Sequence, residues 1–304
     1  MEKLLTSKEL AKAIGASESS MRRWTNSGVI RTARTVGGHR RIAISEAIRF
    51  VRQSGATVVR PDLLGLPDAP AAVAASGPNA PALETRLFEA LRSGDAATAK
   101  GWISGMFLKG MSLASICDGA LHEAMQQMGE LWQTDTRGIL VEHRATGICI
   151  QVLEMLRQLI AQPAVDAPVA LGGAPAGDPY LLPSMMAAHV LAESGYRDMN
   201  YGPETPLELL AAAAAEHKAS IVWLSVKVVS DRARLRREVG TLAQQLEAMR
   251  VKLVIGGDGV ESLAIRAGGH VHTMQSMSEL AAFARGALAL RNEAEAGAVG
   301  TAAP

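Results

Sequence analysis

Arginine side chains near the start of the chain carry the most specific chemistry in this sequence. Arg22 and Arg23 precede Trp24, and the group Gly37-Gly38-His39-Arg40-Arg41 follows. A guanidinium can bind guanine or a phosphate through two parallel N–H bonds, and glycines let a turn approach DNA closely. The pattern therefore predicts a DNA-binding surface. Its candidate contact residues are Arg22, Arg23, Trp24, Arg31, Arg34, His39, Arg40 and Arg41.

The charge distribution supports the same expectation. The net charge is +1, but residues 1–60 hold twelve Lys and Arg against four Glu, so they carry +8 and leave −7 for the rest. A small basic domain on an acidic body is typical of nucleic-acid binding proteins. The alternative is a basic domain that binds protein. Trp24 and His39 could also have structural roles: Trp24 would then pack inside the domain, and His39 would stabilise the turn at Gly37-Gly38.

The elements that must position these arginines follow from the local sequence. A helix is predicted over 4–14, capped near Thr6, and a second helix is predicted to begin at Ser17 or Ser19. The paired glycines predict a hairpin within residues 30–41, and a third helix follows it. This order of elements is that of a winged helix-turn-helix.

The rest of the chain divides by composition and periodicity. Residues 55–82 are rich in Pro, Ala and Gly and predict a flexible linker. Residues 83–165 show helical periodicity with short connections, which predicts an antiparallel four-helix bundle whose third helix covers 112–133. Over residues 166–290, five short apolar runs alternate with helical ones, which predicts a flavodoxin-like (Rossmann-type) doubly wound parallel sheet. The Ala- and Gly-rich residues 291–304 are expected to form a disordered tail.

A second set of candidate residues falls at the ends of these predicted elements. Trp132 ends the third helix of the bundle, and Glu142-His143 follows it. Ser225 and Gly256-Gly257 end two predicted strands, where a parallel sheet binds ligands. Ordinary alternatives exist for all of them. Trp132 could be a core aromatic, Glu142-His143 a pair at a helix start, and Gly256-Gly257 a turn.

Residues 4–52 resemble the MerR family of winged-helix transcription regulators. The resemblance rests on the T-x-x-E-L-A helix start at Thr6 and on the G-G-H-R-R group that begins at Gly37. It implies a winged-helix domain over residues 1–54 that binds double-stranded promoter or operator DNA. Because one small winged-helix domain makes few contacts with DNA, we expect a homo-oligomer, either a dimer or a tetramer.

Residues 83–288 resemble the cobalamin-binding module of CarH/LitR-type light-sensing regulators. The W-x9-E-H spacing from Trp132 to Glu142-His143 carries this resemblance. It implies that Trp132 packs above the cofactor and that Glu142-His143 contacts its upper face. It also implies that Ser225 and Gly256-Gly257 hold the nucleotide tail.

The chain departs from that family where cobalt would be ligated. The family signature D-x-H-x-x-G corresponds to the segment from Asp178 to Pro183, so Tyr180 replaces the histidine and Pro183 replaces the glycine. Gln133 stands where some light-sensing members have a second histidine. A phenol must lose a proton with a pKa of about 10 to become a strong ligand, whereas imidazole is neutral near pH 7. We therefore expect no histidine-ligated cobalamin, and we expect Pro183 to stiffen a loop.

Three states of the predicted pocket stay open: another flat tetrapyrrole such as haem or a bilin, no ligand, or cobalamin held weakly by its tail. The candidate pocket residues are Trp132, Gln133, Glu142, His143, Asp178, Tyr180, Ser225, Gly256 and Gly257.

The expected function is transcription regulation by a repressor whose assembly the sensor module controls. The alternative is a ligand-free, antirepressor-like interaction protein. The sequence has no P-loop, H-E-x-x-H motif or nucleophile elbow, so we expect no enzyme, and we expect no metal site. Because no apolar run reaches the length of a membrane span and no leader is evident, a cytoplasmic protein without membrane contact is expected.

Overall fold

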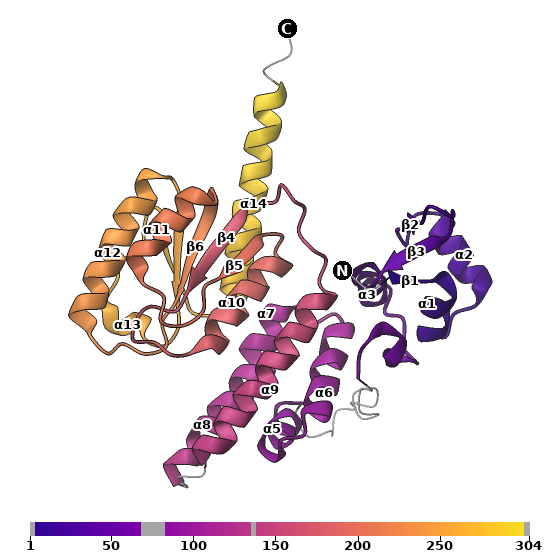
Figure 1. Cartoon of the computed structure of the whole chain (residues 1–304), viewed down its shortest axis with the longest axis horizontal. Coiled ribbons are helices and arrows are strands. Elements are labelled where there is room, and N and C mark those ends of the chain that lie inside the picture. Colours follow the sequence, from indigo (N-terminus) through magenta and orange to yellow (C-terminus); the bar gives the residue numbers. More distant parts are fainter. Residues whose placement is uncertain (1–3, 68–82, 135–137, 301–304) are drawn as a thin grey trace. The chain divides into compact units, whose positions relative to one another are not determined.

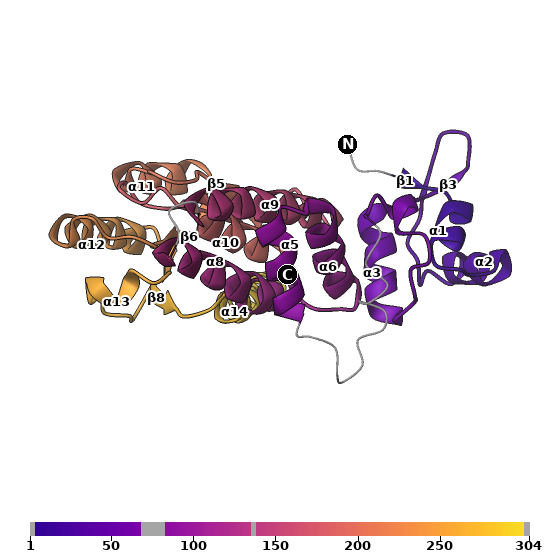
Figure 2. The ribbon, with the colours of Figure 1, turned by 90° about the horizontal axis from the view of Figure 1, so that it is seen from below.

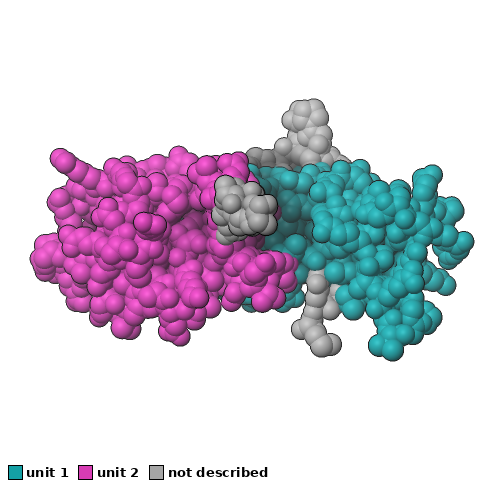
Figure 3. Space-filling model, turned by 90° about the horizontal axis from the view of Figure 1, so that it is seen from above, with its two compact units in different colours: residues 1–161 teal, residues 162–304 magenta. Residues whose placement is uncertain are grey.

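The computed structural model describes residues 4–67, 83–134 and 138–300, with backbone only over 83–84, 132–134 and 295–300. The chain forms two compact units, residues 1–161 and residues 162–304 (Figure 3). No helix within the described ranges has an apolar stretch long enough to cross a membrane.

The first unit begins with two short capped helices. Helix α1 (Ser7–Ala13) has a capping box: Thr6 Oγ1 accepts a hydrogen bond from the Glu9 backbone (3.1 Å), and the Glu9 carboxylate accepts one from the Thr6 backbone (2.7 Å). Helix α2 (Glu18–Asn26) begins after Ser17, whose hydroxyl accepts the Ser20 N–H. These local bonds explain why the predicted helix starts appear in the structure.

A small antiparallel sheet accompanies these helices. Its strands are β1 (Leu4–Leu5), β2 (Ala33–Arg34) and β3 (Arg40–Ala43), in the order β1-β3-β2. Strand β3 leads directly into helix α3 (Ile44–Ser54), which buries one apolar face. Helices α1, α2 and α3 lie together with this sheet (Figure 2).

The prediction of a flexible linker at 55–82 is wrong over its first part. The Val59 and Arg60 N–H groups both donate to the Ala13 carbonyl, at 2.8 and 3.1 Å. A 3-10 turn, η1 (Pro61–Leu64), then packs on α1 and buries Leu64 and Leu66. Two leucines therefore fold the start of this segment onto the domain. Residues 68–82 lie outside the described residues.

A group of helices completes the first unit. They are α5 (Leu83–Ser93), α6 (Ala96–Leu108), α7 (Leu113–Ile116), the π-helical turn η2 (Cys117–Leu121), α8 (His122–Thr134) and α9 (Gly138–Leu159). Helix α5 packs against α6, α8 and α9. The helix predicted over 112–133 is therefore interrupted by a π turn. Cys117 and Cys149 are both buried here, and burial raises the pKa of the Cys149 thiol to about 12, so that thiol stays protonated.

Helix α3 also contacts this helical group. The Arg52 guanidinium lies 3.9 Å from the centre of the Phe107 ring in α6, and its Nη2 donates to the Met111 carbonyl at 3.1 Å. Both α6 and α9 pack against α3. One helix thus joins the N-terminal elements to the rest of the unit.

The second unit is a parallel five-stranded sheet with helices on both faces (Figure 1). Its strands are β4 (Val169–Gly173), β5 (Arg197–Asn200), β6 (Ala219–Ser225), β7 (Lys252–Gly256) and β8 (Val271–Met274). Its helices are α10 (Leu181–Glu193), α11 (Leu207–Glu216), α12 (Arg232–Ala248), α13 (Val260–Leu263) and α14 (Met277–Gly300). The strand order β5-β4-β6-β7-β8 is the doubly wound order that the sequence predicts.

The two faces of the sheet have different partners. Helices α11 and α12 lie on one side of the strands, and α10 and α14 lie on the other (Figure 1). Side chains such as Leu171 and Leu224 form the core under α11 and α12. The expected disordered tail at 291–304 is wrong over 291–300, because α14 continues through Gly300. Its Ala and Glu residues favour a helix. Residues 301–304 lie outside the described residues.

Candidate functional sites

Helix α2 presents an exposed basic surface. The Arg22 and Arg23 side chains are exposed, and together with Ser19, Asn26 and Ser27 they line an open hollow of about 620 Å³. No hydrogen bond or ion pair within the described part of the chain engages either guanidinium. Two cations side by side beyond the N-terminal turn of a helix can bind phosphates or guanine edges.

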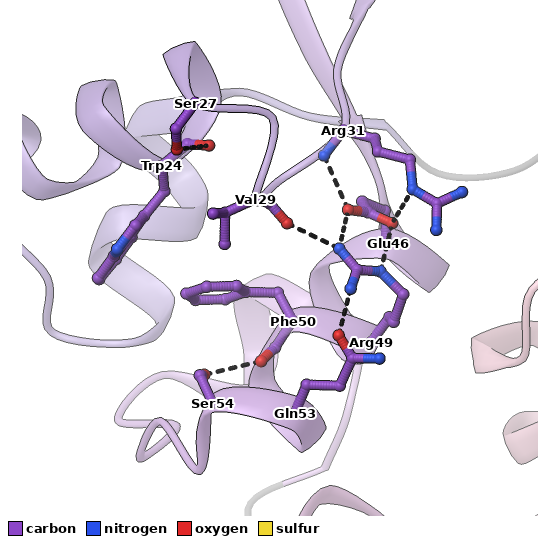
Figure 4. A network of polar contacts seen from close by, with 9 residues as sticks. All are labelled: Trp24, Ser27, Val29, Arg31, Glu46, Arg49, Phe50, Gln53 and Ser54. Atoms are coloured by element: carbon purple, nitrogen blue, oxygen red, sulfur yellow. Dashed lines mark hydrogen bonds and ion pairs between the residues drawn. The ribbon is translucent and has the colours of Figure 1, made fainter.

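Trp24 lies on the inner side of the same helix. Its ring is tilted against the Phe50 ring of α3, with the centroids 5.0 Å apart, and it is half-buried (Figure 4). This contact gives Trp24 a packing role that joins α2 to α3.

Arg40 connects the hairpin to helix α2. Its Nη1 donates to Thr25 Oγ1 at 3.0 Å and to Asn26 Oδ1 at 2.7 Å, and the residue is half-buried. Arg41 Nη1 donates to the Arg40 carbonyl at 3.2 Å. The structure therefore gives Arg40 a bracing contact between β3 and α2, which the sequence pattern alone does not show.

A carboxylate network fixes the segment that follows α2 (Figure 4). Glu46 accepts hydrogen bonds from the Arg31 backbone and from Arg49 Nε, both at 2.8 Å, while Arg49 Nη2 donates to the Val29 carbonyl at 2.8 Å. The exposed Arg31 side chain lies 3.7 Å from Glu46. Burial acts to raise the pKa of Glu46, but the bonds from Arg49 and Arg31 outweigh it and lower that pKa. The ionised Glu46 thus anchors the approach to the hairpin, a role that sequence reasoning missed although Glu46 and Arg49 have the i,i+3 spacing of a helical ion pair.

The hairpin ends in an exposed turn. The Thr35 N–H donates to the His39 carbonyl (2.9 Å), and the His39 N–H donates to Thr35 Oγ1 (3.2 Å). Gly38 has a positive φ of 76°, which explains a glycine at this position. Arg34 and His39 are exposed on this turn, next to the fully exposed Val36.

In the second unit, Asp178 ties two loops together at the carboxyl edge of the sheet. Its carboxylate is fully buried, with Oδ2 accepting hydrogen bonds from the backbones of Lys227 (2.5 Å) and Val228 (3.1 Å). Its Oδ1 accepts the Tyr180 N–H at 3.1 Å. Asp178 therefore joins the loop after β4 to the loop after β6, and this carboxylate is already engaged by protein N–H groups.

Tyr180 and Pro183 stand at the start of α10. Tyr180 is the N-cap residue and its side chain is 42% exposed. Pro183 lies in the first turn of α10, where the backbone N–H has no intrahelical partner to lose. The expectation that Pro183 stiffens a loop is therefore wrong. Tyr201 and Val228, which sequence reasoning missed, are also exposed, at 45% and 39%, on the loops after β5 and β6.

Ser225 and the two glycines end neighbouring strands. Ser225 is buried at the end of β6 and pairs in register with Gly256 of β7. Gly257 has a φ of 108°, and a Cβ there would lie 2.3 Å from the Val226 carbonyl oxygen. Backbone packing is thus sufficient to explain Gly257.

The remaining candidates belong to the first unit. Trp132 and Gln133 lie in the last turn of α8, and their side chains are outside the described part of the structure. Glu142 is half-buried and His143 is exposed in the N-terminal half of α9. Within the residues whose side chains are described, no group of three or more His, Cys, Asp or Glu side chains could hold a metal ion.

Comparisons with known proteins assign two regions of the chain. Residues 4–54 match a model of a helix-turn-helix domain, and residues 83–157 match a model of a B12 binding domain. No curated protein matches the chain. The helix-turn-helix match suggests DNA binding, and the B12 match suggests a cobalamin-type sensor.

Solved structures are similar at low identity. The monomethylamine corrinoid protein of Methanosarcina barkeri shares 17% identity with a TM-score of 0.51, over 66% of this chain and 95% of that one. A cobalamin-binding protein from Desulfitobacterium hafniense DCB-2 shares 19% identity with a TM-score of 0.35, over 69% of this chain and 97% of that one. The first likeness shows the fold: a mixed α/β chain whose parallel sheet resembles the Rossmann-like domains of corrinoid proteins.

Proposed function

We propose that this chain is a sequence-specific transcription regulator of the MerR type, which represses by binding operator DNA. The observation that carries the proposal is the exposed pair Arg22 and Arg23 on the second helix of a helix-turn-helix domain. In such domains the second helix enters the major groove. Arg40 then acts by holding the hairpin against α2, and Arg34 and His39 on the hairpin turn approach the flanking phosphates.

The helices α5 to α9 act as the controlling body. The contact of Arg52 with Phe107 and Met111 supports this role, because α3 also packs on Trp24 of α2 through Phe50. A change in the packing of α6 would therefore reach the DNA-binding helix through α3. Binding of two or four chains to repeated half-sites supplies the affinity for DNA that a single DNA-binding domain lacks.

The module operates without histidine-ligated cobalamin. Two observations support this part of the proposal. Tyr180, which stands in the histidine position of the family signature, is the N-cap residue of α10 and offers a phenol in place of an imidazole. The carboxylate of Asp178 is buried and accepts three backbone hydrogen bonds. The residues present do not fit a cobalt ligated from this loop.

Selection from a pool of random DNA duplexes tests the DNA-binding part. We expect enrichment of a repeated or palindromic motif, and loss of that enrichment for the double variant Arg22→Ala, Arg23→Ala. The charge-matched control Arg266→Ala, Arg285→Ala changes two exposed arginines of the second unit and should enrich the same motif. Recovery of no motif by the wild-type protein would contradict the proposal.

An absorbance spectrum tests the cofactor part. The protein is incubated with hydroxocobalamin and desalted. We expect no stoichiometric cobalamin with the spectrum of histidine ligation. A one-to-one complex with that spectrum would overturn this part and leave the DNA-binding part standing.

A further inference from the structure

One flank of helix α12 is open to solvent. The side of the helix that packs on the sheet holds four buried residues: Leu235, Val239, Leu242 and Leu246. Arg236, Gly240 and Glu247 are exposed, and their spacing of four and eleven residues places them together on another flank. Helix α13, which packs against α12, has only four residues and lies beside one end of it (Figure 1). Most of this flank is therefore available to a partner.

Gly240 keeps the centre of this flank flat. Glycine is a poor helix former, yet Gly240 lies in the middle of a 17-residue helix. Beyond the adjoining backbone, a Cβ added to it would meet no described atom within 4 Å. The folding of the unit itself thus gives no steric reason for a glycine here, whereas a second helix can approach a glycine closely.

Cations without partners gather at the start of α12. Four arginines fall within its first six residues, and its first turn has no acidic residue: they are Arg232, Arg234, Arg236 and Arg237. Arg234 Nε lies 2.6 Å from the Glu238 carboxylate. The other three side chains are exposed and form no hydrogen bond or ion pair within the described part of the chain. Because the positive end of the helix dipole lies here, these cations are unfavourable unless an anion approaches from outside the helix.

The other end of α12 has the opposite charge. Glu247 lies in the last turn, which holds no basic residue, and its side chain is 70% exposed. Its carboxylate lies 3.7 Å from His270 Nδ1, a contact between opposite charges only when the histidine is protonated. This carboxylate too lies at the unfavourable end of the dipole. The flank thus has a positive end, a flat centre and a negative end.

We propose that this flank binds the same flank of a second copy of the chain, with the two α12 helices antiparallel. A two-fold axis at Gly240 lays the positive end of each helix beside the negative end of the other. The partner's Glu247 then lies opposite Ala233, which is three residues, or about 4.5 Å along the helix, from Arg236. An arginine side chain can span that distance. The inference rests on the proposed function, in which two or four chains bind repeated half-sites, and it names the surface that joins two of them.

The arrangement of charge favours a second copy over a polyanion such as DNA. Phosphates would pair with the arginines but would repel Glu247. A second copy supplies both charges in the reverse order. An interface between identical surfaces must be self-complementary in this way.

Charge reversal tests the pairing through the mass of the assembly, measured by sedimentation velocity on the full chain without DNA. We expect a wild-type dimer or tetramer. Arg236→Glu or Glu247→Arg alone sets like charges against each other, so each should weaken the contact at least about 100-fold and halve the mass. An equal mixture of the two variants should restore the mass, because opposite charges face each other again at both contacts. Arg285→Glu changes an exposed arginine of α14 and should leave the mass unchanged.

Three outcomes of this experiment would overturn the inference: a monomeric wild-type protein, single variants of unchanged mass, or a mixture that stays dissociated. A fourth is that Arg236→Glu keeps the mass and lowers the salt dependence of DNA binding. The flank would then bind a polyanion instead of a second copy.

A cysteine at the two-fold axis gives a second readout. A disulfide needs two Cα atoms within about 7 Å, which the proposed axis provides for Gly240→Cys. The native Cys117 and Cys149 are buried, so they contribute little background. We expect a covalent dimer after mild oxidation with diamide. Gly286→Cys, at an exposed glycine of α14 with equal space around it, is the matched control and should stay uncrosslinked.

Crosslinking of neither variant, or of both equally, would count against the interface. Neither measurement of the assembly contains DNA, so its failure would leave DNA binding by Arg22 and Arg23 standing. Failure of the wild-type protein to enrich a DNA motif would contradict the proposed function and leave the α12 interface standing.

Discussion

The two units of this protein use their candidate residues in opposite ways. In the first unit, Arg22 and Arg23 point to solvent with no internal partner among the described residues. In the second unit, Asp178 is fully buried and accepts three backbone hydrogen bonds. Residues that bind a partner must keep their hydrogen-bonding capacity available, and residues that hold a fold must use it internally. We therefore propose that Arg22 and Arg23 of the first unit bind the partner, whereas Asp178 holds two loops of the second unit together.

The largest expected effect comes from removing the exposed cations. The double variant Arg22→Ala, Arg23→Ala should weaken binding to the selected duplex at least about 100-fold, because each bidentate contact contributes about 1–3 kcal/mol. Fluorescence anisotropy at several salt concentrations measures this change. If the double variant bound the duplex within threefold of the wild-type affinity, Arg22 and Arg23 would not be DNA contacts. The contrast between the two units would then be wrong.

Replacement of Asp178 should lower the stability of the second unit and leave the affinity for DNA unchanged. Asp178→Ala leaves the buried N–H groups of Lys227 and Val228 without their acceptor, so we expect a loss of about 2–4 kcal/mol in the free energy of unfolding of the second unit. Urea denaturation measures it. Asp258→Ala is the matched control, since it removes only an exposed ion pair with Lys227 and should cost less than about 1 kcal/mol. Equal effects of the two variants would contradict the role assigned to Asp178.

Variants of Arg40 test whether this residue supports DNA binding indirectly, by holding β3 against α2. Arg40→Ala should weaken DNA binding about tenfold while leaving the slope of affinity against salt unchanged, because no phosphate contact is lost. Asn26→Ala should cause a similar loss, and the double variant should lose little more, since both remove one hydrogen bond. A slope that falls by about one in Arg40→Ala would instead show a phosphate contact.

The smallest effect concerns Glu46 and pH. Its pKa is lower in the folded state than the ordinary value of 4.5, so its contribution to stability is present above about pH 4.5 and is lost as the pH falls through the folded pKa. We expect no more than about 1 kcal/mol, because the network is partly exposed. Thermal melts of wild type and Glu46→Gln from pH 7 to pH 3 measure it. The stability difference between them should shrink towards acid, and a constant difference would contradict the ion-pair role.

Local signals predicted much of the fold. Thr6 with Glu9 and Ser17 predicted two helix starts because a capping bond forms within four residues of chain. The alternation of apolar strands and helices predicted the parallel sheet, since both periodicities are visible in one stretch of sequence. The turn at Gly37-Gly38 predicted the hairpin for the same reason.

Contacts between distant residues could not be predicted in this way. An arginine next to a glycine turn is typical of a DNA contact, so the sequence predicts that role for Arg40. Its hydrogen bond to Asn26 depends on how β3 packs against α2, which the sequence pattern does not show. Asp178 meets the Lys227 backbone only after a whole βα unit has folded between them.

The most direct test is the ratio of dissociation constants for the selected duplex and a scrambled duplex, measured with the full chain by anisotropy at 0.15 M salt. Specific DNA-binding proteins prefer their site by about 1,000-fold or more, and we expect a ratio of that order for the wild-type protein. We expect the ratio to fall towards one for Arg22→Ala, Arg23→Ala. A wild-type ratio near one would show that the exposed arginines bind DNA without reading its sequence, and would contradict the proposed regulator.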